Sequence, residues 1–333
     1  MVERTPGSHH KDGATKMAKT NTKVAGIDTA KATLDIAVHG RTEHWQVDNT
    51  PAGWRELSEL LTAQRVGRVG IEATGGYEVG VIAALRAAGF TVIRHQPLQI
   101  SAFARMRLRR AKTDRLDAAL IAHFTALFTD DRPAPDPRFA AFALHLTHIE
   151  QLEGRIKQTK TFLEHQSEPR LRRQWESRLK ADQKEVAYEL ALLVKALRQQ
   201  PDLDRRLELL LTIDGIGLRT AVALVVGMPE LGQISREEAA ALAGLAPFVR
   251  QSGKRAGEAH IDGGRARVRT ALYAAALPAA FQWNPALVAF YARLKKAGKS
   301  HKKALVACAR KLLIYANTVL QRDTPWRKIA TQS

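Results

Sequence analysis

Cysteine is nearly absent from this sequence of 333 residues, which contains only Cys308. A single thiol excludes a disulfide within the chain and a zinc site built from several thiolates. The sequence also lacks an apolar run approaching the ~18 residues of a transmembrane helix, and it shows no signal peptide. These absences predict a cytoplasmic protein that does not enter a membrane.

Acidic residues are much fewer than basic ones in this sequence. The chain carries 52 Lys and Arg against 33 Asp and Glu, which gives a formal net charge of +19 and a pI near 10.3. An excess of this size in an otherwise globular composition predicts a nucleic-acid partner, because the phosphate backbone attracts basic surfaces.

The first half of the chain predicts one domain behind a lead-in. Residues 1–21 lack apolar periodicity and are expected to be disordered, with Met17 as an alternative natural start. From residue 22 to 135, the pattern predicts strands at 24–28, 34–38, 44–47, 68–71 and 91–94, with helices at 51–64, 77–88 and from 114 onward. This order of strands and helices is that of a ribonuclease-H-like α/β domain.

Four carboxylates occupy the ends of these elements. Asp28 ends the first strand, Glu72 ends the strand after the first helix, and Asp114 and Asp117 begin the last helix. Residues three apart share one helix face, and ligand sites of open sheets lie at strand ends. We therefore expect the four side chains to converge on a hard metal ion.

An alternative for the Asp114 and Asp117 pair is a helix start whose acids complement the helix dipole. Asp35 and Asp48 are interpreted as solvated loop residues. Just upstream of the pair stands a group of cations that predicts contact with a polyanion: Arg105, Arg107, Arg109, Arg110 and Lys112.

The second half of the chain is predicted to be mostly helical. After a proline-rich linker at 130–137, residues 140–203 show long apolar periodicity with charged outer faces, which predicts a coiled-coil hairpin turning near 167–169. A second domain is expected at 204–325. Within it, Asp214-Gly-Ile-Gly217 between two apolar helices resembles a helix-hairpin-helix, in which Gly215 and Gly217 let backbone N–H groups approach a phosphate. The alternative is a tight turn used only for packing.

A glycine- and arginine-rich stretch follows at 244–269. Ser252 lies there on a glycine-flanked loop, placed like a nucleophile facing a phosphodiester, or like a serine–glycine turn that only binds phosphate. The cations around it are Arg250, Lys254, Arg255 and Arg265. Farther on, lysines at 295–303 form either a phosphate-binding patch or a solvated face.

Several motifs together resemble one family. The first half contributes Gly26-Ile-Asp28-Thr-Ala-Lys31, Ile71-Glu72-Ala-Thr-Gly75 and Ala111-Lys112-Thr113-Asp114-Arg-Leu-Asp117-Ala118. The second half contributes Gly215-Ile-Gly217, Gly244-Leu-Ala-Pro247, Ser252-Gly253 and Ile261-Asp-Gly-Gly-Arg265. These resemble the DEDD transposases of the insertion sequence 110 family, bridge-RNA-guided recombinases, over residues 22–320.

This resemblance implies a fold, a chemistry and partners. The first half would be a RuvC-like domain in which Asp28, Glu72, Asp114 and Asp117 hold Mg²⁺. The last part would be a transposase domain whose Ser252 attacks DNA and forms a transient covalent link. The resemblance further implies donor and target double-stranded DNA, a structured bridge RNA, a tetramer built from dimers, and a bacterial, nucleoid-associated protein. The absence of a P-loop agrees with strand exchange that needs no ATP.

Three other functions compete with this interpretation. A RuvC-like, metal-dependent nuclease or junction resolvase would need the four carboxylates but no serine. A non-catalytic RNA-binding protein would need only the basic surface. A tyrosine recombinase using Tyr273 or Tyr291 is weaker, because its arginine and histidine constellation is not evident.

Overall fold

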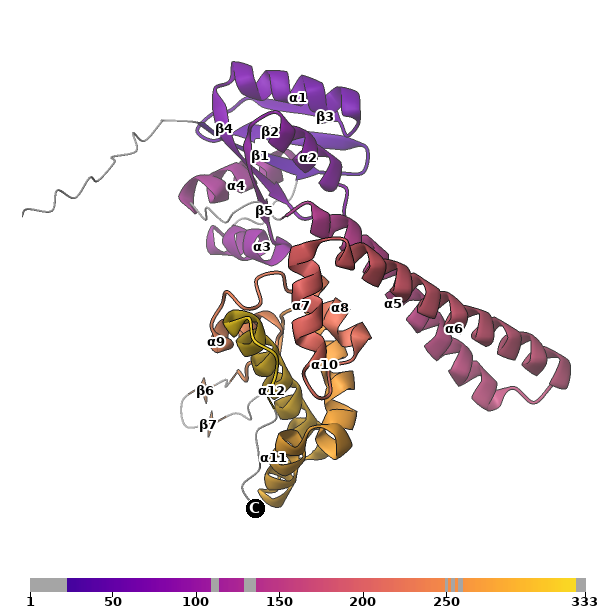
Figure 1. The fold of residues 1–333 in the computed structure, drawn as a ribbon. Coiled ribbons are helices and arrows are strands. Elements are labelled where there is room, and N and C mark those ends of the chain that lie inside the picture. Colours follow the sequence, from indigo (N-terminus) through magenta and orange to yellow (C-terminus); the bar gives the residue numbers. More distant parts are fainter. Residues whose placement is uncertain are drawn as a thin grey trace, which may run out of the picture. The chain divides into compact units, whose positions relative to one another are not determined.

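A five-stranded mixed sheet organises the first of two units into which the chain divides, residues 1–134 and 135–333 (Figure 1). The computed structural model describes residues 23–108, 114–128, 136–248, 251–252, 255–256 and 260–327. Of residues 114, 115, 251, 252, 255 and 256 it describes the backbone alone. The predicted lead-in at 1–21 lies outside the described residues. Within the described ranges, no helix has the length and apolarity needed to cross a membrane.

The sheet has the strand order β3-β2-β1-β4-β5. Its strands are β1 (Lys23–Thr29), β2 (Thr33–Val38), β3 (His44–Asp48), β4 (Val66–Glu72) and β5 (Thr91–His95). The first three strands pair antiparallel, as two short connections allow, and β4 and β5 run parallel to β1. The parallel pairs need crossover helices, which α1 (Pro51–Ala63) and α2 (Val79–Ala87) supply.

The two faces of the sheet bury different sets of side chains. Ala25, Ile27, Val69 and Ile71 point to the core shared with α1 and α2. Because side chains alternate along a strand, the residues between them point to the opposite face. That face is covered by α4 (Asp114–Leu127), and α3 (Pro97–Met106) packs against α4 through a smaller apolar cluster.

The predicted ribonuclease-H-like order of elements is confirmed, with one addition. The sequence pattern gave one helix after the last strand, whereas the structure has both α3 and α4. Helix α3 is short and buries only Ile100 and Phe103, so its apolar periodicity is weak. Its start is defined instead by Pro97 at the first turn and by a capping box between Gln96 and Gln99.

The second unit begins with the predicted antiparallel hairpin of α5 (Arg138–His165) and α6 (Pro169–Arg198), which lie side by side in Figure 1. Glu168 caps α6 by accepting from the backbone N–H groups of Arg170 and Leu171. Ion pairs such as Arg155–Asp182 (2.8 Å) connect the two helices on their outer faces.

The rest of the unit is mostly helical, and its helices pack around one large core. Its helices are α7 (Pro201–Leu211), α8 (Leu218–Gly227), α9 (Arg236–Leu242), α10 (Ala266–Pro278), the π-helix η1 (Ala279–Trp283), α11 (Pro285–Lys296) and α12 (His301–Arg322). Arg219 of α8 pairs with Glu153 of α5 through two 2.8 Å contacts, which fixes the hairpin onto this core. Burial in α12 raises the pKa of the Cys308 thiol to about 11, so this cysteine is an inert packing residue.

Candidate active site

Three neighbouring strands carry a row of carboxylates across one face of the sheet. Asp28 of β1 lies directly opposite Asp35 of β2 in the antiparallel register. On the other side of β1, Ile27 pairs with Ile71, and continuing that parallel register brings Asp28 beside Glu72. Adjacent strands are about 4.8 Å apart, so the sheet itself brings these side chains together.

His95 extends this row onto β5, where it pairs in register with Glu72. The imidazole is buried, and its Nε2 lies 2.8 Å from Thr125 Oγ1 of α4. The sequence pattern did not single out His95, because an apolar strand followed by histidine carries no chemical signature.

Helix α4 covers this face and runs opposite to β1. A Cβ on Gly26 would overlap the backbone of Ala122, so only glycine lets the helix approach this closely. One residue farther along α4, His123 Nδ1 lies 3.0 Å from His39 Nε2. The His39 amide donates to Val24 O at the beginning of β1, so the later part of α4 lies over the start of that strand.

The N-terminal turn of α4 consequently lies at the Asp28 end of β1. Asp28 is two residues beyond Gly26, a distance of about 7 Å, which corresponds to four to five residues of helix. Counting back four to five residues from Ala122 places Asp117 level with Asp28, and Asp114 lies about one helical turn farther toward the start of α4. The fold therefore brings the ends of β1 and β4 and the first turns of α4 to one end of the same sheet face.

The side chains at this end are half-buried. Asp28, Glu72 and Asp117 all fall in this class, and each has an interaction partner in the structure. The Asp114 side chain lies outside the described residues. Among the side chains that are described, no three from His, Cys, Asp and Glu form a group that could hold a metal ion.

Asp35 is not the solvated loop residue that the sequence indicated. It lies within β2, its exposed fraction is 4%, and it is 3.0 Å from His44 Nε2. Gln46 Nε2 also donates to both carboxylate oxygens at 3.2 Å. The interpretation failed because the local pattern gave no sign that Asp35 stands opposite Asp28. Asp48, at the end of β3, is exposed as expected.

Glu78 fixes the loop that follows Glu72. Its buried carboxylate accepts from the backbone N–H groups of Thr74 (3.1 Å) and Gly76 (3.0 Å) and lies 2.6 Å from Arg94 Nη2. Burial acts to raise the pKa of Glu78, but hydrogen bonds from backbone N–H groups and the Arg94 charge together hold it below the usual range.

Glu78→Gln is expected to lower the free energy of unfolding at pH 7 by about 2 kcal/mol, because it removes a charge-assisted network from a buried site. A depressed pKa stabilises the fold above the unfolded-state pKa, about 4.3, and this contribution is lost as the pH falls. Urea denaturation should therefore show the difference from wild type shrinking below pH ~4. The exposed Glu59→Gln is the control, and equal stability of the Glu78→Gln and Glu59→Gln proteins at pH 7 contradicts the assignment.

Ser252 lies on a hairpin rather than on an irregular loop. The strands β6 (Gln251–Ser252) and β7 (Arg255–Ala256) pair antiparallel, with Ser252 opposite Arg255. At the base of the hairpin, Phe248 and His260 exchange backbone hydrogen bonds of 2.8 and 3.1 Å. For Ser252 and Arg255 the structure describes the backbone but not the side chain. Five other predicted residues lie wholly outside the described residues: Arg109, Arg110, Lys112, Arg250 and Lys254.

The glycine motifs on either side of the hairpin pack against each other. Gly244 and Gly264 have φ of +66° and +65°, and a Cβ on Gly264 would overlap the Gly244 backbone. Arg269 Nη1 donates to Gly263 O (2.6 Å) and Ala243 O (3.2 Å), which ties the two motifs together. The motifs Gly244-Leu-Ala-Pro247 and Ile261-Asp-Gly-Gly-Arg265 thus form the base from which the Ser252 hairpin projects.

The predicted phosphate-binding residues differ in their surroundings. Arg265 is half-buried and engaged within the unit, because Nη1 donates to Gly227 O (2.7 Å) and Nη2 lies 2.5 Å from Glu230. Gly215 has a φ of +103°, and a Cβ there would overlap Ala279, so packing accounts for this glycine. Gly217 is the N-cap residue of α8, and a Cβ there would meet open space. Arg105 and Arg107 are exposed at the end of α3.

Two family models of transposases match different parts of this chain. Residues 25–165 match a family model for IS110-type DEDD proteins, described as a transposase, and residues 207–292 match the model "Transposase IS116/IS110/IS902 family". The pilin gene-inverting proteins of Moraxella bovis and Moraxella lacunata are each 28% identical over 326 residues, which cover 91% of this chain and 97% of theirs. A solved structure, T. thermophilus RuvC in complex with a Holliday junction substrate, is 20% identical and aligns with 34% of this chain and 99% of its own at a TM-score of 0.27.

Proposed function

The chain belongs to the IS110 family of transposases, and from this premise we propose that it joins donor and target DNA by Mg²⁺-dependent transesterification through a covalent Ser252–DNA intermediate. A structured bridge RNA would select both DNA sites by base pairing. The observation that carries the proposal is the gathering of Asp28, Glu72 and the start of α4 at one end of one sheet face.

The donor set suits Mg²⁺. The ion prefers carboxylate oxygens, and Asp28, Glu72, Asp114 and Asp117 are the residues that would hold it. When bound, Mg²⁺ would stabilise negative charge on the phosphate oxygens. Asp35 would keep its own partners, His44 and Gln46, and would add negative potential next to Asp28.

Ser252 would supply the nucleophile. Its Oγ forms a bond to the phosphorus while the bond from phosphorus to one DNA oxygen breaks, and the hydroxyl proton passes to a base. Arg250, Lys254 or Arg265 would stabilise the charge that develops on the phosphate. The phosphoserine ester conserves the energy of the phosphodiester, so a second DNA end can attack it and reseal the strand without ATP.

The partners follow from this chemistry. The curated relatives are named for inverting a pilin gene, and inversion requires paired breaks that are rejoined in a new order. A tetramer built from dimers would bring a carboxylate row and a Ser252 hairpin from different subunits to one DNA strand. The protein would act on the bacterial nucleoid in the cytoplasm.

A metal-dependent nuclease of the RuvC kind is the second candidate function. It is favoured by one observation, namely that the first unit gathers its carboxylates without any residue of the second unit. Such an enzyme would release DNA ends by hydrolysis with water and would leave no protein attached.

RNA guidance is tested by purifying the protein from its source and sequencing the RNA that accompanies it. We expect one abundant structured RNA with two segments that pair with the two DNA ends of the element and with its insertion site. Recovery of RNA without such pairing would overturn guidance, while leaving the serine chemistry open to its own test.

A further inference from the structure

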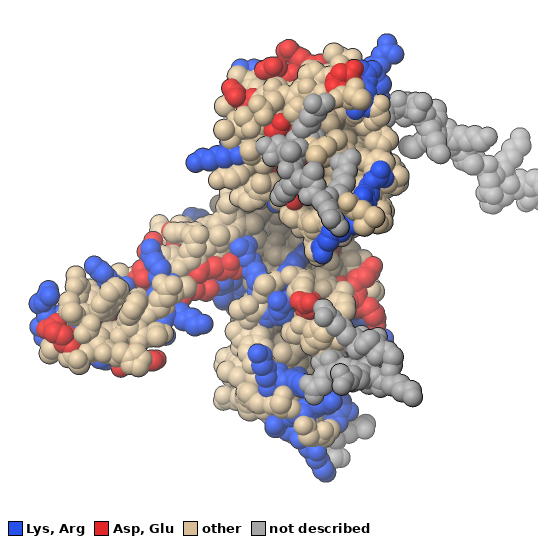
Figure 2. Space-filling model, turned by 180° about the vertical axis from the view of Figure 1, so that it is seen from behind, with Lys and Arg blue, Asp and Glu red and all other residues tan. Residues whose placement is uncertain are grey.

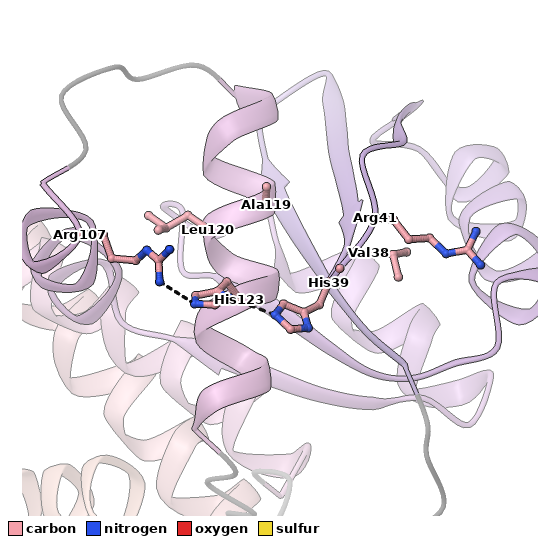
Figure 3. Close-up of a pocket in the computed structure, with 8 residues that line it drawn as sticks. Val38, His39, Arg41, Arg107, Ala119, Leu120 and His123 are labelled. Carbon is pink, nitrogen blue, oxygen red and sulfur yellow. Dashed lines mark hydrogen bonds between the residues drawn. The ribbon is translucent and has the colours of Figure 1, made fainter.

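A hollow of about 240 Å³ lies beside the later part of α4, between the end of β2 and the end of α3 (Figure 3). Its lining includes His39, Arg41, Arg107 and His123, together with small and apolar residues. No carboxylate is among the described residues that line it, so the hollow offers hydrogen-bond donors and positive charge but no anionic group.

Three of these side chains form a chain of hydrogen bonds, drawn as dashed lines in Figure 3. Arg107 Nη1 lies 2.9 Å from His123 Nε2, and His123 Nδ1 lies 3.0 Å from His39 Nε2. A guanidinium can only donate, so His123 Nε2 accepts and His123 carries its proton on Nδ1. His39 Nε2 then accepts in turn, which leaves the Nδ1–H of His39 as the donor at the end of the chain.

The surrounding structure holds this chain in place. The ring of Phe103 stacks on His123 with centroids 5.6 Å apart. Immediately after Arg107, Leu108 adopts a φ of +53°, although its side chain is 87% exposed and gains no burial there. A non-glycine residue in this conformation is strained, and such strain gathers at functional sites.

The geometry points to a binding site for one phosphate group of a nucleic-acid backbone, with Arg107 and His39 as its donors. This inference rests on the proposed function for the identity of the ligand. His123 lies six residues beyond Asp117, about 9 Å along α4. Because one DNA strand rises 3.4 Å per nucleotide, a strand that reaches the carboxylate row can place a phosphate two or three nucleotides away in the hollow.

The test compares Arg107→Gln and His39→Gln with Arg55→Gln, an exposed arginine of α1 on the opposite face of the sheet. Affinity for a DNA duplex is measured by fluorescence anisotropy at several salt concentrations, which needs no catalysis. We expect Arg107→Gln to bind about 3- to 10-fold more weakly and to reduce the slope of log K against log salt by about one. Arg55→Gln should match the wild type in both respects.

The outcomes separate the possible ligands. The inference is overturned if Arg107→Gln and His39→Gln both bind the DNA duplex with wild-type affinity and with the wild-type slope of log K against log salt. A thermal shift with inorganic phosphate that the variants lose, without a change in DNA affinity, indicates a site for free phosphate and also overturns it. The binding assay does not require strand cleavage. Its result therefore still tests the phosphate site if Ser252 proves not to be the nucleophile.

A second basic surface, at the end of α11 and the start of α12, supports an independent inference. Residues 263–322 contain 12 Lys and Arg but no Asp or Glu. Exposed lysines cluster where α11 ends and α12 begins, and the lower part of this unit in Figure 2 shows the gathering of basic side chains. They are Lys295, Lys296, Lys299, Lys302 and Lys303.

An exposed aromatic ring, that of Phe281, lies next to these lysines, because it contacts His301, the residue before Lys302 and Lys303. Phe281 and Trp283 of η1 are 53% and 55% exposed. The Phe281 ring stacks on His301 (6.1 Å) and contacts Tyr291 (5.0 Å), and the Tyr291 hydroxyl lies 2.7 Å from His301 Nδ1. A rigid, solvent-facing aromatic group beside ammonium groups matches the way proteins bind strands with unpaired bases.

We infer that this surface binds single-stranded nucleic acid, with bases stacked on Phe281 and Trp283 and phosphates on the lysines. Phe281→Ala and Trp283→Ala should each weaken binding of a single-stranded oligonucleotide about 5- to 100-fold, and binding of the matching duplex much less. Tyr188→Ala, at a 62% exposed aromatic residue of α6, is the control. Equal losses for single strand and duplex, or no loss at all, overturn the inference.

Discussion

Ser252→Ala is expected to abolish the covalent protein–DNA adduct and to reduce strand joining by about 10⁴-fold or more, the scale on which loss of a nucleophile acts. Alanine has no oxygen that can attack phosphorus. The pairing of β6 with β7 uses the backbone, and the base of the hairpin rests on Gly244 and Gly264, so the substitution should leave the fold intact. The measurement is a denaturing gel of labelled DNA ends incubated with the protein, its co-purified RNA and Mg²⁺.

A matched serine serves as the control. Ser167 is exposed in the turn between α5 and α6, and Ser167→Ala should form the adduct at the wild-type level. Nucleic-acid binding by the Ser252→Ala protein should persist, because binding depends on cations and not on this hydroxyl. An adduct of undiminished yield in the Ser252→Ala protein would assign the nucleophile to another residue.

Asp28→Asn is expected to reduce DNA strand cleavage by at least about 10³-fold without unfolding the protein, since one lost ligand disables a metal site while the shape is preserved. Asp28 stands between Asp35 and Glu72, so removing its charge relieves repulsion among neighbouring carboxylates. The melting temperature of the variant should stay close to that of the wild type, because asparagine keeps the shape of the side chain.

Metal binding gives a readout that is independent of cleavage. Mg²⁺ should raise the melting temperature of the wild type, because a ligand that binds the folded state stabilises it, and Asp28→Asn should lose this shift. Asp48→Asn, at an exposed acid that ends β3, should retain both the shift and the activity. Full cleavage by Asp28→Asn, or an unchanged response to Mg²⁺, contradicts the assignment of this residue.

The two variants together distinguish the competing functions. Loss of activity in both supports the serine recombinase. Mg²⁺-dependent hydrolysis that survives Ser252→Ala but not Asp28→Asn supports the RuvC-like nuclease. Full retention of every activity by both, including nucleic-acid binding, supports a non-catalytic RNA-binding protein.

Local sequence patterns were sufficient for every strand and for all but one helix of the first unit. The strands and the two crossover helices follow from apolar periodicity and from Pro51, Thr74 and the glycines that end them, so Asp28 and Glu72 could be placed at strand ends. Helix α3 was not predicted, because it buries only two apolar side chains and its sequence therefore shows little apolar periodicity. The motifs near Ser252 were recognised, but not the hairpin that they support.

The basic charge, the order of the elements and the identity of the acids at their ends can be read along the chain, because each depends only on residues and their near neighbours. Which residues face one another depends on how the elements pair and pack in three dimensions. Asp35 stands opposite Asp28 because of strand register, and His39 meets His123 across 84 residues of sequence because α4 packs on Gly26. Register and close packing are properties of paired elements, and no single segment contains the information for both partners.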